Sequence, residues 1–151
     1  DLDGAQLDSI CAGEITLDSI REAVTDVSRF ERDALLEAIH EAEPGRIARA
    51  VDSLEAEGEP LPLLLWALTE ELRLMMQLTA GERPRRFLDP DRTQRIQRTA
   101  RKHDAASFDR QLLRAHRIDR MIKGVETGDP WDEILEMSLA LAGRPALRPA
   151  A

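Results

Sequence analysis

The sequence predicts an all-α protein: a helical bundle of about five to six helices, preceded by a short helical remnant of a neighbouring domain. Leu, Ala, Glu and Arg are abundant, whereas tyrosine is absent and aromatic residues make up only 3% of the chain. These abundant residue types are strong helix formers. Apolar residues recur at spacings of three and four, and capping residues, prolines and glycines separate the periodic segments.

The chain has 151 residues, of which 42% are hydrophobic and 33% charged, a balance typical of a soluble globular protein. Its richest apolar stretch, Leu61 to Leu78, is interrupted by Glu70, Glu71 and Arg73. We therefore expect no membrane contact. The start of the chain lacks both Met and a secretory pattern, and we interpret the chain as a piece of a longer protein.

The only cysteine is Cys11, which excludes an internal disulfide and favours a cytoplasmic location. Its neighbours Asp8, Glu14 and Asp18 are acidic. A reactive thiol requires a basic neighbour that lowers its pKa, so we expect Cys11 to be a small buried apolar residue.

The first predicted helix begins after Thr16, which is a suitable N-cap residue. Ile15 and Ile20 are placed to form a hydrophobic staple across this start. The apolar face of this short helix consists of Leu17, Ile20, Val24 and Val27. A separate second helix is expected from Glu31 to Ala42.

Pro44 begins a third predicted helix that extends to about Glu57, where Gly58 supplies a left-handed residue after its end. The fourth helix covers Leu61 to Leu78. Its apolar residues occupy more than one face, so we expect it to be buried on several sides.

A basic segment, Arg83 to Lys102, follows as a loop and a polar helix with Ile96 and Ala100 facing inward. Residues 81–103 carry 8 basic and 3 acidic side chains, whereas residues 1–60 carry 16 acids and 5 bases. A fifth apolar pattern predicts a helix from Ala105 to about Gly124, and Asp129-Pro130 begins the last helix, which ends at Gly143.

No catalytic, metal-binding or cofactor-binding residue is predicted, and we do not expect this chain to be an enzyme. The scattered glycines form no phosphate-binding loop. His40 lies beside Glu37 and Glu41, a combination we interpret as solvated helix surface rather than a metal site. For Glu70 and Glu71, we expect pairing with Arg73 or an outward position rather than a role as acid or base.

The basic segment allows two interpretations. Its arginines could neutralise the phosphates of DNA, with Arg85, Arg86, Arg95 and Arg98 as the candidate contacts. They could equally be solvated or face acidic surfaces of partner subunits. Only Phe87 is interleaved with them to stack on a base.

Three stretches together resemble the delta subunit of DNA polymerase III, which belongs to the bacterial clamp loader. They are Gly45 to Arg73, with its Ala-rich helix, Glu57-Gly58-Glu59-Pro60 and Leu65-Trp66-Ala67-Leu68; Ala115 to Gly124; and Asp129 to Leu141, with Asp129-Pro130-Trp131-Asp132. The resemblance lies in their order and spacing and covers nearly the whole chain.

The resemblance implies that residues 1–28 are the C-terminal remnant of the AAA+-like lid domain and that residues 29–151 are the helical collar domain. The implied partners are the gamma/tau and delta-prime subunits, which would meet the chain through a pentameric collar. The sliding clamp would be bound only by an N-terminal domain that this sequence does not include. The parent holoenzyme is a DNA-directed DNA polymerase, whereas this part would hold delta in the loader without catalysis.

Partner contacts in such a collar are expected from large or charged side chains on the relevant helices, namely Trp66, Arg73, Met76, Arg117, Arg120 and Lys123. We expect Trp66 and Trp131 to pack in the core. Family members often carry a tryptophan in the basic segment, which Arg92-Thr93-Gln94-Arg95 lacks. DNA contact by a helical module using residues 83–102 is the alternative function.

Overall fold

The computed structural model describes residues 16–144, except for the side chains of residues 24, 25 and 28. This part of the chain is all-helical, as predicted. Its helices are α2 (Leu17–Glu41), α3 (Pro44–Ala56), α4 (Leu61–Thr79), α5 (Pro90–Ala100), α6 (Ala105–Ile122) and α7 (Pro130–Leu141). The predictions for Cys11 and for Ile15 in a staple lie outside the described residues.

Four helices begin at a side-chain cap. The Thr16 hydroxyl accepts a hydrogen bond from the Ser19 amide at 3.3 Å, which confirms the predicted start of α2. Asp89, Asp104 and Asp129 accept amide hydrogen bonds at the starts of α5, α6 and α7. Each cap satisfies an amide that the first turn of a helix leaves without a partner.

The prediction of separate helices up to Val27 and from Glu31 is wrong, because α2 is continuous from Leu17 to Glu41. No glycine or proline lies between these residues to interrupt the backbone hydrogen bonds. The expected domain boundary between residues 28 and 29 therefore falls within a helix.

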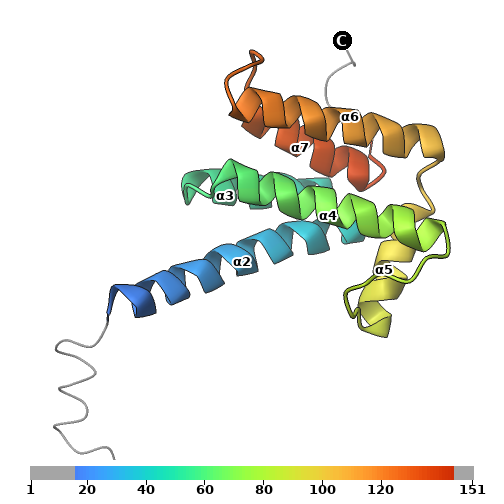
Figure 1. The fold of residues 1–151 in the computed structure, drawn as a ribbon, viewed down its shortest axis with the longest axis horizontal. Coiled ribbons are helices and arrows are strands. Elements are labelled where there is room, and N and C mark those ends of the chain that lie inside the picture. The colour runs from blue at the N-terminus through green and yellow to red at the C-terminus, as the bar shows by residue number, and fades with distance from the viewer. Residues whose placement is uncertain (1–15, 145–151) are drawn as a thin grey trace, which may run out of the picture.

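The helices form a bundle from which the first half of α2 projects (Figure 1). α6 and α7 lie together as an antiparallel hairpin, α3 and α4 lie across the middle, and α5 crosses below the end of α4. The second half of α2 packs on α3, while α4 packs on α5 and α6. The position of α5 against α2 and α4 creates the site described below.

The core is apolar and centres on α4, whose Leu64, Leu68, Leu72 and Met75 are almost completely buried. α6 contributes Ile118 and α7 contributes Ile134 and Met137 to the same core; Ile96 does so from α5. The predicted inward residues Ile96 and Ala100 are thus confirmed.

Burial of α4 on several sides is only partly confirmed. Leu65 and Leu74 are buried in addition to the central row, but Leu63 and Trp66 are exposed. The prediction that Trp66 is a core residue is therefore wrong, since 59% of it is exposed. Trp131 does pack against the core.

In the described part of the chain, five helix ends are followed by a residue with a positive φ: Ala42, Gly58, Gly81, Gly124 and Gly143. Gly58 has a φ of 71°, as predicted from its position after α3. Ala42, after α2, also has a positive φ of 56°, which is unfavourable for a residue with a Cβ atom. Arg144 donates two hydrogen bonds to the Ala42 carbonyl oxygen, at 2.8 and 3.1 Å, and so holds this turn against the end of α7.

Candidate functional site: an arginine cleft

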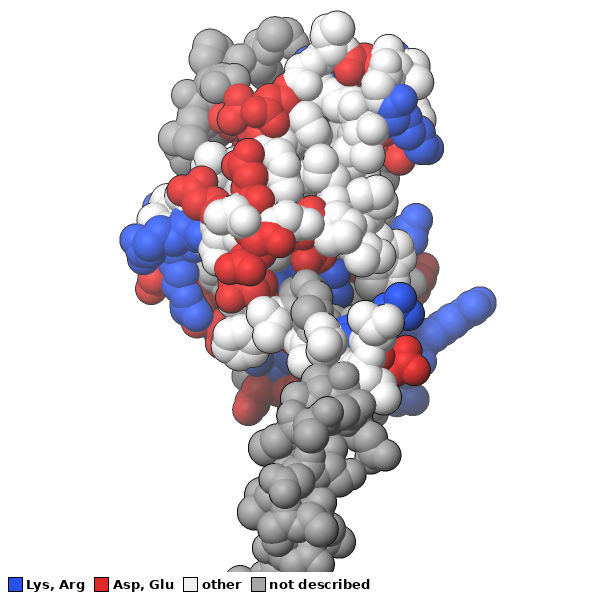
Figure 2. Space-filling view, turned by 90° about the vertical axis from the view of Figure 1, so that its left-hand side faces the viewer, with Lys and Arg blue, Asp and Glu red and all other residues white. Residues whose placement is uncertain are grey.

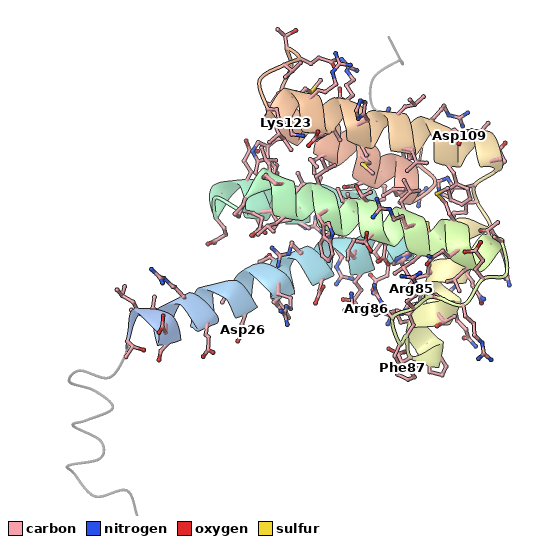
Figure 3. The ribbon with its side chains drawn as sticks, viewed as in Figure 1. Asp26, Arg85, Arg86, Phe87, Asp109 and Lys123 are labelled. Atoms are coloured by element: carbon pink, nitrogen blue, oxygen red, sulfur yellow. The ribbon has the colours of Figure 1, made fainter. Side chains whose placement is uncertain are left out.

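A cleft of about 830 Å³ lies between α2, α4, the connection that follows α4, and α5. We call it the arginine cleft because six arginines line it: Arg29, Arg32, Arg85, Arg86, Arg92 and Arg95. Figure 3 shows Arg85 and Arg86 in the space between α2, α4 and α5. Four carboxylates also line the cleft: Asp33, Glu37, Glu70 and Glu71.

A buried polar network joins three helices at the cleft. The His40 ring of α2 lies with Nε2 2.6 Å from Oε1 of Glu71 in α4. Its Nδ1 lies 2.7 Å from the hydroxyl of Thr99 in α5. Because a carboxylate can only accept, the proton on Nε2 donates to Glu71. This network fixes the relative positions of the helices that form the cleft.

Arg92 extends the same network toward the cleft. Its Nη2 donates to Oε2 of Glu71 at 2.9 Å, so both carboxylate oxygens of Glu71 have a partner. Only 2% of the Glu71 side chain is exposed. A carboxylate at such a position needs these partners, because an unpaired buried charge is costly.

These contacts overturn two predictions. His40 is not solvated surface, and Glu71 neither points outward nor pairs with Arg73. The expected pairing does hold for Glu70, whose carboxylate accepts a hydrogen bond from Arg73. Glu70 and Glu71 are adjacent in a helix and therefore point in directions about 100° apart, so one can reach solvent while the other is buried.

Two further cleft arginines have partners within the chain. Arg32 forms an ion pair with Glu59, whose side chain is buried, and this pair ties α2 to the α3–α4 connection. Arg95 lies 3.7 Å from Glu37, a longer and half-exposed pair.

The other three, Arg29, Arg85 and Arg86, form no hydrogen bond or ion pair with the described part of the chain. All three are exposed, and Trp66 lines the same cleft. The cleft therefore combines arginines held by carboxylates with guanidinium groups whose donors are available to a ligand.

The predicted DNA-facing residues do not all come together. Arg85, Arg86 and Arg95 line the arginine cleft, whereas Arg98 is exposed outside it. Phe87 is 89% exposed and does not line the cleft either. In Figure 3 it lies at the far end of α5 from the bundle.

The predicted partner-contact residues lie on two helices. On α4, Trp66 lines the cleft, Arg73 is exposed and Met76 packs partly against the core. Arg117, Arg120 and Lys123 are exposed near the end of α6 and pair within the chain. Arg117 and Arg120 contact Glu126, and Lys123 contacts Asp119 at 2.6 Å. The hydrogen bond to Glu126, reinforced by the nearby charge of Glu133, raises the pKa of Arg117 above its ordinary value.

Acidic side chains gather on another surface. Figure 2 shows them on the end of the molecule that carries the connections between α3 and α4 and between α6 and α7. Exposed acids of these segments include Glu55, Glu57 and Asp129. This end of the molecule is therefore rich in negative charge.

Arg29, Arg32, His40 and Glu71 were missed as cleft residues by the sequence predictions. Their spacing did contain a signal, because Arg29, Arg32, Leu36 and His40 recur at steps of three and four and therefore share a helix face. The sequence does not show that this face meets α5, because that contact depends on the path of the chain after α4.

In residues 16–144, no three His, Cys, Asp or Glu side chains are grouped so that they could hold a metal ion. None of the helices described for this chain combines the length and the apolar character that crossing a membrane would need. Comparisons with family models, with curated proteins and with solved structures gave no match. The resemblance to clamp-loader delta subunits stays a prediction.

Proposed function

We propose that this chain is a non-catalytic assembly module, the collar domain of a clamp-loader delta subunit with part of the preceding lid domain. Its role would be to hold delta beside the gamma/tau and delta-prime subunits in the cytoplasm during loading of the sliding clamp. The proposal combines the order of the three sequence stretches with an all-helical fold and the surface described next.

The observation that carries the proposal is an uncovered apolar face on the first half of α2. Leu17, Ile20, Val27 and Phe30 are all exposed, Phe30 to 71%. At 100° per residue these four positions fall on one side of the helix. This half of α2 projects from the bundle (Figure 1), so no other described helix covers that face.

Exposed apolar surface on one helix face is typical of a contact with another protein or domain. A rigid helix that passes from residues 17–30 into the bundle would transmit the position of a preceding domain to the collar. On α4, Leu63 and Trp66 add a second exposed apolar pair at a spacing of three. Aromatic anchors such as tryptophan are enriched among residues that dominate binding energy at interfaces.

The direct test mixes the chain with purified gamma/tau and delta-prime subunits and follows molar mass by light scattering coupled to gel filtration. We expect the chain to elute within a larger complex of defined mass. Elution of the chain alone at micromolar concentration, while the other subunits assemble normally, would contradict an assembly role.

The alternative, a DNA-binding module, is favoured by one observation: Arg85, Arg86 and Arg95 lie in a single cleft with Trp66. Binding of DNA through these arginines would weaken steeply as salt rises, because phosphate contacts release counterions. Titration of fluorescent single-stranded DNA at two salt concentrations distinguishes this function from assembly.

A further inference from the structure

We propose that the arginine cleft is a docking groove for an acidic peptide segment of a partner protein, with an apolar side chain of that segment against Trp66. This inference rests on the proposed assembly function and assigns one contact surface to it. The groove is formed by Trp66 and the unpaired Arg29, Arg85 and Arg86, on a floor held by His40, Glu71 and Arg92.

The contacts already present in the cleft indicate which groups its arginines bind. Arg32, Arg92 and Arg95 each pair with a carboxylate of this chain. Guanidinium groups present several donors in a planar fork that matches a carboxylate. Arg29, Arg85 and Arg86 have the same chemistry but lack a carboxylate partner within residues 16–144. Carboxylates of an acidic segment would give these three arginines the partners that the other cleft arginines already have.

Charge on the cleft walls favours a peptide over a nucleic-acid strand. Asp33, Glu37 and Glu70 line the cleft together with the arginines. A phosphodiester backbone carries a negative charge at every nucleotide and offers no donor, whereas a peptide can place its acidic side chains only where the unpaired arginines lie. A peptide also supplies backbone N–H groups, which can donate hydrogen bonds to the carboxylates of Asp33 and Glu70.

The aromatic residues favour the same conclusion. Proteins that bind single strands without sequence preference stack successive bases on several aromatic side chains. Among the described residues, Trp66 is the only Phe or Trp side chain that lines the cleft, and Phe87 lies outside it. One tryptophan beside unpaired arginines matches a peptide in which a single apolar side chain packs on the tryptophan and neighbouring acidic side chains pair with the arginines.

The floor of the groove is already ordered. Hydrogen bonds from His40 and Arg92 to Glu71, together with the contact between His40 and Thr99, hold α2, α4 and α5 in place. The helices that form the groove would therefore not rearrange on binding, which lowers the entropic cost of association, while the side chains of Arg29, Arg85 and Arg86 would still lose rotamer freedom.

The experiment uses Trp66 as its reporter. Trp131→Phe in the full chain leaves Trp66 as the only tryptophan. The probe is a synthetic peptide in which Glu alternates with Leu, so that it can bind in an extended conformation with its backbone N–H groups free, and the same peptide with Lys in place of Glu is the control. We expect the acidic peptide to shift Trp66 emission with saturation at low salt, and the Lys peptide to leave it unchanged.

The variant Arg85→Glu/Arg86→Glu should weaken this binding by about tenfold or more, because attraction becomes repulsion at the mouth of the groove. The matched control is Arg98→Glu/Arg101→Glu, which makes the same charge change at exposed positions of the same segment outside the cleft. Equal weakening by both variants, or no binding of the acidic peptide, overturns the proposal. Circular dichroism checks that both variants remain folded.

An oligothymidylate titrated in parallel distinguishes the nucleic-acid alternative. The peptide assignment would be overturned in favour of nucleic acid if the oligonucleotide binds more tightly than the acidic peptide and this binding is lost in Arg85→Glu/Arg86→Glu.

The assembly assay distinguishes failure of this inference from failure of the proposed assembly function. If the wild-type chain and the Arg85→Glu/Arg86→Glu variant assemble equally well, the groove assignment fails and the assembly function stands. If the wild-type chain does not assemble, the proposed assembly function is wrong, and the peptide titration still shows what the cleft binds.

Discussion

His40 and Glu71, which lie 31 positions apart in the chain, meet at 2.6 Å across the interface between α2 and α4. The carboxylate of Glu71 also accepts from Arg92 of α5, so one buried side chain links three helices. Since these helices form the walls of the arginine cleft, the shape of the cleft depends on this contact.

Glu71→Ala should therefore lower the free energy of unfolding by about 3 kcal/mol, because it leaves the buried His40 and the partly buried Arg92 without their partner. Urea denaturation followed by circular dichroism measures the change. The control is Glu70→Ala, which removes a half-exposed pair with Arg73 and should cost less than about 1 kcal/mol. Equal losses in the two variants would show that the network contributes no special stability.

Two reciprocal substitutions test the helix ends. Ala42→Gly should raise the free energy of unfolding by about 1 kcal/mol, because Ala42 has a positive φ that glycine adopts without strain. Gly58→Ala should lower it by about the same amount, since Gly58 has a φ of 71°. No atom lies within 4 Å of a Cβ built at Gly58, so backbone strain alone would account for that loss. Thermal unfolding of both variants and of the parent chain shows whether each substitution raises or lowers the stability.

The two sides of α4 should respond differently to truncation. Leu68→Ala should destabilise the chain by about 3 kcal/mol, because Leu68 is fully buried and its removal leaves a cavity. Leu63→Ala, which removes the same atoms from a half-exposed position, should change stability by less than about 1 kcal/mol. Denaturant midpoints of the two variants provide the comparison, and a large loss for Leu63→Ala would mean that its surface is covered in the free chain.

Trp66→Ala should separate folding from binding. We expect the free chain to lose about 1 kcal/mol or less, because 59% of Trp66 is exposed. Incorporation into a complex with gamma/tau and delta-prime should fall by about tenfold or more if Trp66 is an interface anchor. Light scattering with gel filtration measures incorporation, and His116→Ala, at an exposed position on α6, is the control. Unchanged incorporation of Trp66→Ala would exclude Trp66 from the interface.

The helices themselves could be predicted because their signals are local. Thr16 and Asp129 cap helices as expected, and Gly58 ends α3 in the predicted conformation. A capping side chain bonds to an amide two or three residues away, so its effect is contained in the local sequence. The error in α2 was the expected break between Val27 and Glu31, where the intervening residues allow the helix to continue.

The candidate site could not be predicted in the same way. His40 was assigned to solvated helix surface because Glu37 and Glu41 lie beside it, and Glu71 was expected to pair with Arg73 or to point outward. Their burial results from the packing of α5 against α2 and α4, which local pattern does not reveal. Trp66 was expected in the core, yet it lies on a side of α4 that no other helix of residues 16–144 covers completely.

The sequence by itself determined the all-helical class, most helix ends and the inward residues of α5, because periodicity and capping act within a few residues. Only the tertiary structure decided which charged residues are buried and which arginines share a cleft. Those properties depend on contacts between residues such as His40 and Glu71 that are distant in the chain. A charged side chain becomes a structural contact or a free binding group according to whether the fold brings an opposite charge to it, as it does for Arg92 and does not for Arg85 within the described residues.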